Sequence, residues 1–586
     1  MAYKDKMPLK AFWEAVEERL AACSTDELRA ILRAMAERTL PMGRQAFLNQ
    51  LKAVDPKAAA GQQALAEEGL LADISDLKRE IEEKSTHADE WEENRSWDDH
   101  GYNDEDGLGP YEDFVEPLSG LFDRTEATFD YGNLALARAA CQKLFELLEL
   151  EDDYGRGIRS DDLQDVNMDE ARARYLRAVY ETEPPARRAK VLFEEMQKAG
   201  RLTGHLRPKL NDVIQISTKP LPDQERFLPD WIAFLRKEDG ANADAWLREA
   251  IRLAQGTRGL EELARTEGKK RPRAYLDWVA ALTQEGKHRE ALAAAQEALR
   301  TLDRELPIRA AIADQLCAAA ERLNETKTIA DGRWEAFDAN PVLERLLDLW
   351  ESAPAGEKRV GLMQKAAQHV KDHMTAESRH QGMQEQALDE DDDAIRGWVS
   401  ESTLAHAYLL AGDWQAAHQL VAREKVLGWS SSDNPQGLVV SVFLVRLSRK
   451  APNALPPNLG EEWGWALKRG LAFTDWEREE KADERALQRL ESAYAERLSQ
   501  MPLSTEHEKE ILSWCFDIAK RRTKEIVSNQ HRGSYGKAAV LTAACAETLR
   551  LRGDDKDADA LLNDVRTRFP RHSAFQAELR KATGQR

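Results

Sequence analysis

Metal chemistry is the first possibility that residue spacing in this sequence raises. The segment "HVKDHMTAESRH" places three histidines and a glutamate close to one face of an expected helix: His369, His373, His380 and Glu377. Two histidines four residues apart can bind one metal ion. The segment lacks the glutamate that follows the first histidine in zinc-protease helices, and its surroundings are polar. We therefore interpret it as a solvated helix face and expect no metal site and no cofactor.

The acidic stretch 87–114 is a second candidate for cation binding, with eleven carboxylates and one arginine. Its segment "YNDEDGLGPYED" matches a calcium loop at positions 3, 5, 6 and 12, which are Asp104, Asp106, Gly107 and Asp113. Position 1 is Tyr102, which cannot supply the required carboxylate.

Two interpretations of this acidic stretch remain. It is an exposed linker, because such a charge density cannot form a core. Alternatively, its aromatic residues form an adhesive segment that docks on a basic partner or on the protein itself. The aromatic residues concerned are Trp91, Trp97, Tyr102 and Tyr111.

The sequence contains no recognisable arrangement of residues for nucleophilic catalysis. There is no phosphate-binding GxxxxGK[ST] loop and no GxSxG elbow. The five cysteines are far apart, and each lies in an apolar-periodic stretch, which predicts buried free thiols: Cys23, Cys141, Cys317, Cys515 and Cys545. We expect a protein that is not an enzyme, although a triad assembled from distant residues stays open.

The charge balance argues against nucleic acid and membranes as partners. Asp and Glu number 105 and Lys and Arg 84, so the net charge is −21, which repels phosphate backbones and anionic lipids. The basic clusters "KKRPR" (269–273) and "RRTKE" (521–525) are short, and helix-end or solubility roles explain them. No signal peptide and no run of about 18 uncharged apolar residues is found. We expect a soluble, cytoplasmic protein.

The elements that would position any site are helices, and three segments suggest that they repeat. Aligned on Gly286, Gly412 and Gly553, the segments have apolar residues eight, seven and four positions before the glycine and an alanine five positions after it. Such spacing puts the apolar residues on one helix face, lets the chain reverse at the glycine, and allows the second helix to approach closely. The only strand candidates are "DVIQIS" and "GLVVSVFLV", and the second is equally a buried helix.

This pattern resembles the tetratricopeptide repeat. The matching positions of the first copy are Trp278, Val279, Leu282, Gly286, Ala291, Ala295 and Ala298. Those of the second copy are Leu404, Ala405, Tyr408, Gly412, Ala417 and Val421, and those of the third are Cys545, Ala546, Leu549, Gly553, Ala558, Leu562 and Pro570. The resemblance implies an all-α, helix-turn-helix solenoid. The alternative is a globular helical bundle in which these matches are accidental.

Residue composition, prolines and helix-capping residues divide the chain into several predicted parts. A capping box at Ser24 and a proline at 41 indicate a small three-helix module at the N-terminus. The predicted parts are this module (1–58), a helix with the acidic linker (59–115), helical repeats (116–200), a Pro-containing linker (201–229), further repeats (230–386), an acidic loop (387–396) and C-terminal repeats (397–586).

The resemblance also implies a function, a non-catalytic scaffold or adaptor whose groove holds a protein or peptide partner. In the family, the first helix of each repeat lines the groove. Carried onto this sequence, the polar groove positions are Arg273, His406, Glu547 and Arg550, which we predict to bind the partner. Two alternatives stay open: a regulatory subunit or protease substrate in a bacterial signalling or defence complex, and a hydrolase with an unrecognised site.

Overall fold

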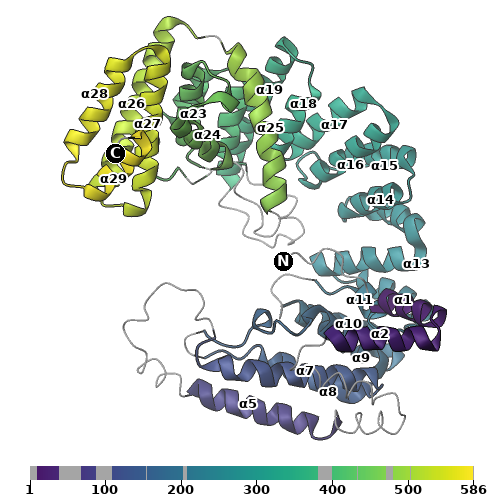
Figure 1. Ribbon diagram of the computed structural model, residues 1–586. Coiled ribbons are helices and arrows are strands. Elements are labelled where there is room, and N and C mark those ends of the chain that lie inside the picture. The colour runs from purple at the N-terminus through teal and green to yellow at the C-terminus, as the bar shows by residue number, and fades with distance from the viewer. Residues whose placement is uncertain are drawn as a thin grey trace. The chain divides into compact units, whose positions relative to one another are not determined.

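The computed structural model describes residues 9–38, 67–86, 108–152, 155–201, 207–380, 399–429, 431, 433–469, 479–501 and 503–584. The regular elements among these residues are all helices, as Figure 1 shows, which confirms the all-α prediction for this part of the chain. The chain forms two compact units, Met1–Leu260 and Glu261–Arg586. No helix in the described ranges is both long and apolar enough to cross a membrane.

The N-terminal helices α1 (Leu9–Ala22) and α2 (Thr25–Arg38) meet at the predicted capping box. The backbone N–H of Ser24 donates to Oε2 of Glu27 at 2.8 Å, and the backbone N–H of Glu27 donates to Oγ of Ser24 at 3.4 Å. Two N–H groups that a helix start leaves free are thereby satisfied, and the capping prediction is confirmed. The predicted third helix of the module lies outside the described residues.

The rest of the first unit is a succession of helices, most of which pack on a helix that comes shortly before them in the chain. Contacts link α5 with α7 and α8, α7 with α8, α8 with α9, α9 with α10 and α11, and α10 with α12. A kink at Gly256, where φ is 63°, interrupts the last helix, α13. The bounds are α5 (Leu70–Thr86), α7 (Val115–Asp130), α8 (Leu134–Leu147), α9 (Met168–Thr182), α10 (Pro185–Arg201), α11 (Leu210–Gln215), α12 (Gln224–Leu235) and α13 (Ala241–Glu267).

The described part of the predicted Pro-containing linker, 207–229, contains helical segments that pack on α9 and α10. It holds α11, which includes most of the strand candidate "DVIQIS", and the start of α12. The fully buried Arg177 of α9 explains the difference, because its guanidinium donates to the carbonyls of Val213, Lys219 and Pro220. The carbonyls of these three residues therefore accept hydrogen bonds from one arginine side chain instead of from the N–H groups of a helix or sheet.

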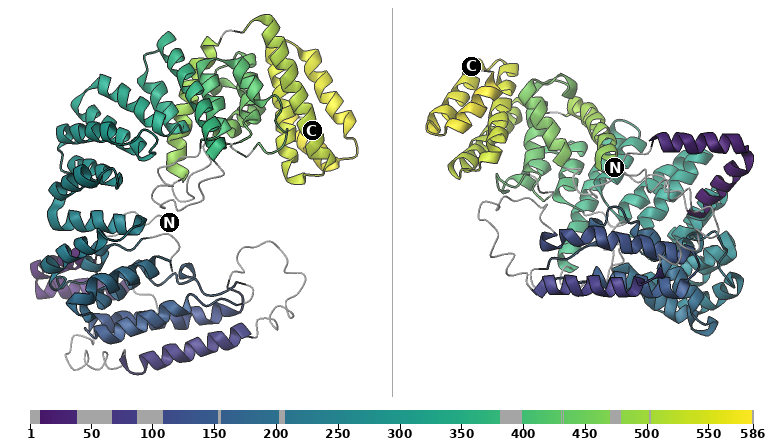
Figure 2. Two further views of the ribbon diagram at one scale, coloured as in Figure 1. Left: turned by 180° about the vertical axis from the view of Figure 1, so that it is seen from behind. Right: turned by 60° about the horizontal axis from the view of Figure 1, so that its bottom comes forward.

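The second unit continues the same succession, from α14 to α24 without a break in the contacts between neighbours (Figure 1; Figure 2 shows it from behind). Its helices are α14 (Arg273–Gln284), α15 (His288–Thr301), α16 (Ile308–Leu323), α17 (Thr326–Ala339), α18 (Leu343–Ser352), α19 (Glu357–His380), α21 (Glu401–Ala411), α22 (Trp414–Val421), α23 (Gln436–Ser448), α24 (Pro457–Arg469), α25 (Glu479–Gln500), α26 (Thr505–Ser528), α27 (Tyr535–Arg552), α28 (Asp555–Arg568) and α29 (Ser573–Thr583). Short 3₁₀ turns occur at Gly109–Phe114, Ser160–Asp162, Pro452–Ala454 and Arg532–Ser534.

All three predicted hairpins are present, as α14–α15, α21–α22 and α27–α28. Their turn glycines Gly286, Gly412 and Gly553 have φ of 73°, 76° and 89°, a left-handed conformation that other residues adopt only at a cost. The alanines five residues later, Ala291, Ala417 and Ala558, are fully buried.

Two helices of the second unit are buried over most of their surface. In α23, which contains "GLVVSVFLV", twelve of the thirteen residues are buried, and most of α27 is buried as well. α27 contacts α23, α24, α26, α28 and α29. The second unit is therefore a succession of hairpins that closes, toward the C-terminus, around a central helix.

The three turn glycines provide a test of this packing. We expect Gly553→Ala to destabilise the protein by about 1 kcal/mol, the order of cost of a left-handed alanine, because a Cβ there meets no atom within 4 Å. A Cβ on Gly412 would lie 1.6 Å from a guanidinium nitrogen of Arg497, so Gly412→Ala should cost about 1–3 kcal/mol more. Urea unfolding of both variants measures the difference, and equal losses would contradict the close approach of Arg497.

Candidate functional site

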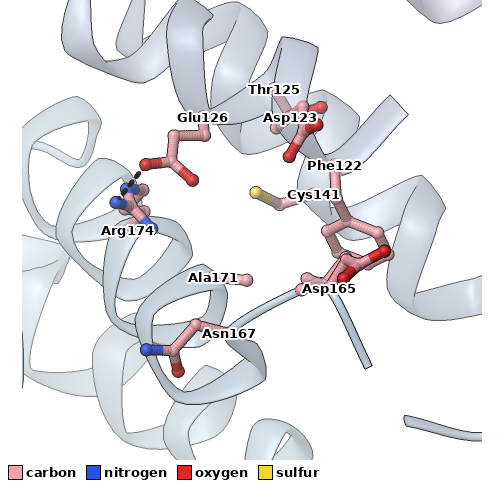
Figure 3. Close-up of a pocket in the computed structure, with 10 residues that line it drawn as sticks. Phe122, Asp123, Thr125, Glu126, Cys141, Asp165, Asn167, Ala171 and Arg174 are labelled. Carbon is pink, nitrogen blue, oxygen red and sulfur yellow. Dashed lines mark hydrogen bonds and ion pairs between the residues drawn. The ribbon is translucent and has the colours of Figure 1, made fainter. Parts of the chain in front are cut away.

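The first unit contains a polar cavity between α7, α8, α9 and the loop that precedes α9. Its volume is about 40 Å³, which is room for a few water molecules. Figure 3 shows that the side chains of Glu126, Cys141 and Arg174 point into the same space. The lining residues are Phe122, Asp123, Thr125, Glu126, Cys141, Asp165, Val166, Asn167, Ala171 and Arg174.

Carboxylates outnumber cations around this cavity. Arg174 donates to Glu126 at 2.5 Å and to Glu170 at 3.2 Å. Burial raises the pKa of Glu126 in spite of Arg174, and burial together with the charge of Asp165 raises the pKa of Asp123. Groups whose charged form is disfavoured in this way concentrate at functional sites, although structural clusters do the same.

The thiol in the cavity is disfavoured as a thiolate, the form that acts as a nucleophile. Burial raises the pKa of Cys141 to about 12, so its thiolate is rare. Burial likewise raises the pKa of Cys317 to about 12 and the pKa values of Cys515 and Cys545. All five cysteines are free, and all except the half-buried Cys23 are buried, which confirms the prediction for those four.

The histidine cluster is not the solvated face that its spacing suggested. His369 is half-buried against Trp334 and Phe337, at ring distances of 6.0 and 5.9 Å, and its Nε2 lies 3.0 Å from the carbonyl of Asp338. For His369 the interpretation was wrong, because the other helices that cover a face cannot be read from the sequence of one helix. Within the described residues no group of three or more His, Cys, Asp or Glu is placed to hold a metal, and the side chains of Glu377 and His380 lie outside them.

The predicted adhesive segment is described only at its end. Tyr111 is 1% exposed, and its hydroxyl donates to Asp152 at 3.3 Å, so it is a core residue of the first unit and not part of an open surface. Trp91, Trp97 and Tyr102 lie outside the described residues, as does the predicted acidic loop 387–396.

The structure does not bring the four predicted partner-binding residues together. Arg273 is half-buried at the start of α14. Arg550 is exposed on α27 and pairs with Asp559 at 3.0 Å. The other two residues, His406 and Glu547, have contacts inside the second unit.

His406 is 0% exposed, and its Nδ1 lies 2.8 Å from the hydroxyl of Tyr494 in α25. Burial lowers the pKa of His406 to about 3, so the imidazole is neutral at physiological pH. His406 therefore presents no exposed group to a partner. In this repeat copy, the position that faces a groove in the resembled family faces another helix of the same chain.

Glu547 acts as a cap for a neighbouring helix. Its carboxylate accepts the backbone N–H groups of Asn458 at 3.3 Å and Leu459 at 2.8 Å, in the first turn of α24, and the side-chain amide of Asn458 at 2.6 Å. A negative charge at a helix N-terminus satisfies free N–H groups and interacts favourably with the helix dipole.

Sequence reasoning missed α25 as the element that contacts the repeat helices. Its Arg489, Tyr494 and Arg497 are separated by 86 to 141 residues from the groups that they contact. The only signal in the sequence is the amphipathic pattern of α25, which does not name the surface that it covers. The comparisons with known proteins add no family, because no family model matches the chain and no curated protein matches it significantly.

The carboxylate cluster around the cavity predicts a pH-dependent stability. Because the pKa of Asp123 is raised in the folded protein, its charge destabilises the fold above that pKa and has no effect below the ordinary value of about 3.9. We expect Asp123→Asn to raise the free energy of unfolding at pH 7 by less than about 1 kcal/mol, since solvent screens the site, and to have no effect near pH 3. Urea unfolding at both pH values tests this. Asp123 and Asp230 are both exposed residues, but only Asp123 lines the cavity, so Asp230→Asn is the control. A loss of stability at pH 7 would contradict the prediction.

The contrast between Glu547 and Arg550, three residues apart on α27, gives a second prediction. Glu547→Ala should lower the free energy of unfolding by roughly 1.5–3 kcal/mol, because two backbone N–H groups of α24 lose a charged acceptor. Arg550→Ala should change it by less than about 0.5 kcal/mol, as is usual for exposed residues. Equal effects of the two substitutions in urea unfolding would show that Glu547 is not a structural cap.

Proposed function

We propose that the protein is a non-catalytic interaction scaffold or adaptor that holds a protein or peptide partner. The observation that supports this most directly is the recurrence of one hairpin geometry, with a left-handed glycine and a buried alanine, in three places. Hairpins of this kind stack into surfaces that many tetratricopeptide-like proteins use for peptide binding. The raised pKa values of the four buried thiols favour binding over covalent catalysis.

The first repeat copy is the best place for the partner. Its groove positions on α14, namely Arg273, Leu276, Ala280 and Thr283, are all partly exposed. The corresponding positions of the second copy, Val399, Ser402, His406 and Leu409, are all buried. An arginine beside small and apolar positions suits a segment with a carboxylate next to an apolar anchor.

The proposal predicts the effect of one substitution. Once the partner has been identified by affinity purification from the native host and mass spectrometry, Arg273→Ala should weaken its binding by roughly 1.5–3 kcal/mol, the contribution of a hydrogen bond to a charged group. Arg300→Ala is the matched control, since Arg300 is exposed on α15, the second helix of the same hairpin. Equal affinities of the two variants, measured by calorimetry, would show that the partner does not bind this face of α14.

A further inference from the structure

The helix α25 lies across the first helices of two successive hairpins. It contacts α18 and α21, as well as α24 (Figure 1). One face of α25 is buried, through Ala486, Leu490, Ala493, Tyr494 and Leu498. The residues between them, such as Gln488, Glu491, Ser492 and Ala495, are exposed. In contrast to α23, this helix is therefore enclosed on one side only.

Charged contacts hold α25 at several points along its length. Arg489 pairs with two carboxylates of α18, those of Asp348 and Glu351, each at 2.6 Å. Glu496 pairs with Arg359 of α19 at 2.6 Å. Most of these side chains are half-buried, and only Glu351 is exposed, so the pairs lie at the edge of the interface between α25 and the helices beneath it.

Near its C-terminal end, α25 binds the turn of the second repeat copy. Arg497 donates to the carbonyl of Ala411 at 2.9 Å, directly before the turn glycine Gly412. The hydroxyl of Tyr494 lies 2.8 Å from Nδ1 of His406, and the tyrosine ring packs edge-on against Trp463 at 5.5 Å. His406 is one of the groove positions carried over from the repeat family, so α25 occupies the groove at this place.

The interface beneath α25 leaves polar atoms unpaired. Three buried nitrogens have no hydrogen-bond partner among the described residues: Nε2 of His406, Nε1 of Trp463 and Nε of Arg497. Buried polar groups are nearly always paired, and each unpaired one favours a state in which water or another group can reach it. Unpaired buried atoms occur elsewhere among the described residues too, but these three lie beneath one helix, so detachment of α25 would expose all three to water.

We propose that α25 is an internal ligand of the groove formed by α18 and α21, and that a partner helix with the same pattern of contact residues replaces it. The partner that fits is an amphipathic helix with the pattern Arg-Leu-x₃-Tyr-x₂-Arg-Leu, which is that of residues 489–498. Its two arginines reach the carboxylates of α18 and the end of α21, and its leucines and tyrosine fill the space between. The inference rests on the proposed scaffold function and names the partner for a second part of the groove.

The first test measures whether α25 detaches while the rest of its unit stays folded. Hydrogen exchange of the full-length protein should show amides of α25 at least tenfold less protected than those of α23, because a one-sided helix opens locally. Protection of α25 equal to that of α23 would mean that α25 leaves only on global unfolding, and the proposal would be wrong. This measurement needs no partner, so its outcome is independent of the scaffold proposal.

The second test asks whether the groove accepts a helix from outside. The probe is a fluorescent peptide of residues 479–500, added to the full-length protein. We expect it to bind the Arg489→Ala/Arg497→Ala variant at least tenfold more tightly than the unsubstituted protein, because the internal helix competes less well. Arg485→Ala, at an exposed position of the same helix, is the control and should behave as the unsubstituted protein. Equal binding of the peptide by the double variant and the unsubstituted protein would overturn the proposal.

Discussion

Close approach between consecutive helices is the constraint on which the rest of this structure depends. An α-helix satisfies its backbone hydrogen bonds internally, so side-chain packing has to join one helix to the next. The hairpins achieve this with alanine at the point of contact, as at Ala291 and Ala417, both fully buried. In the α16–α17 pair the approach is closer still, because a Cβ on Gly332 would lie 2.7 Å from both Sγ of Cys317 and Cδ2 of Leu316.

What the sequence could predict follows from the range of the interactions involved. The hairpins are local, since a glycine, an alanine and a few apolar residues within about fourteen residues determine them, and all three were predicted. The placement of His406 was not predictable, because nine of the eleven residues of α21 are buried and no face of the helix is marked as the outer one. The contacts of α25 were equally unpredictable from the sequence, because residues such as Arg489 and Asp348, which pair in the structure, are 141 residues apart in the chain. The same applies to the cavity, which residues of three helices and a loop form together.

Several arginines of this acidic protein donate hydrogen bonds to the carbonyl groups at the ends of helices. The last carbonyls of a helix have no partner within the helix, and they lie at the negative end of its dipole. Arg309 donates to the carbonyls of Leu299 and Leu302 at the end of α15. Arg359 does so for Ala353 after α18, and Arg446 for Met501 after α25. A side chain with five donors on a flexible stem suits this task better than lysine, and these three arginines therefore join successive parts of the chain.

The burial of α23 over most of its surface has a consequence for how the chain is made. α23 ends at Ser448, whereas α27, which packs against it, begins at Tyr535. During translation, the ribosome releases an apolar helix long before its covering exists, and such a surface associates with other chains or with chaperones. A premature stop codon between the two helices would consequently yield an aggregation-prone fragment rather than a shorter working protein.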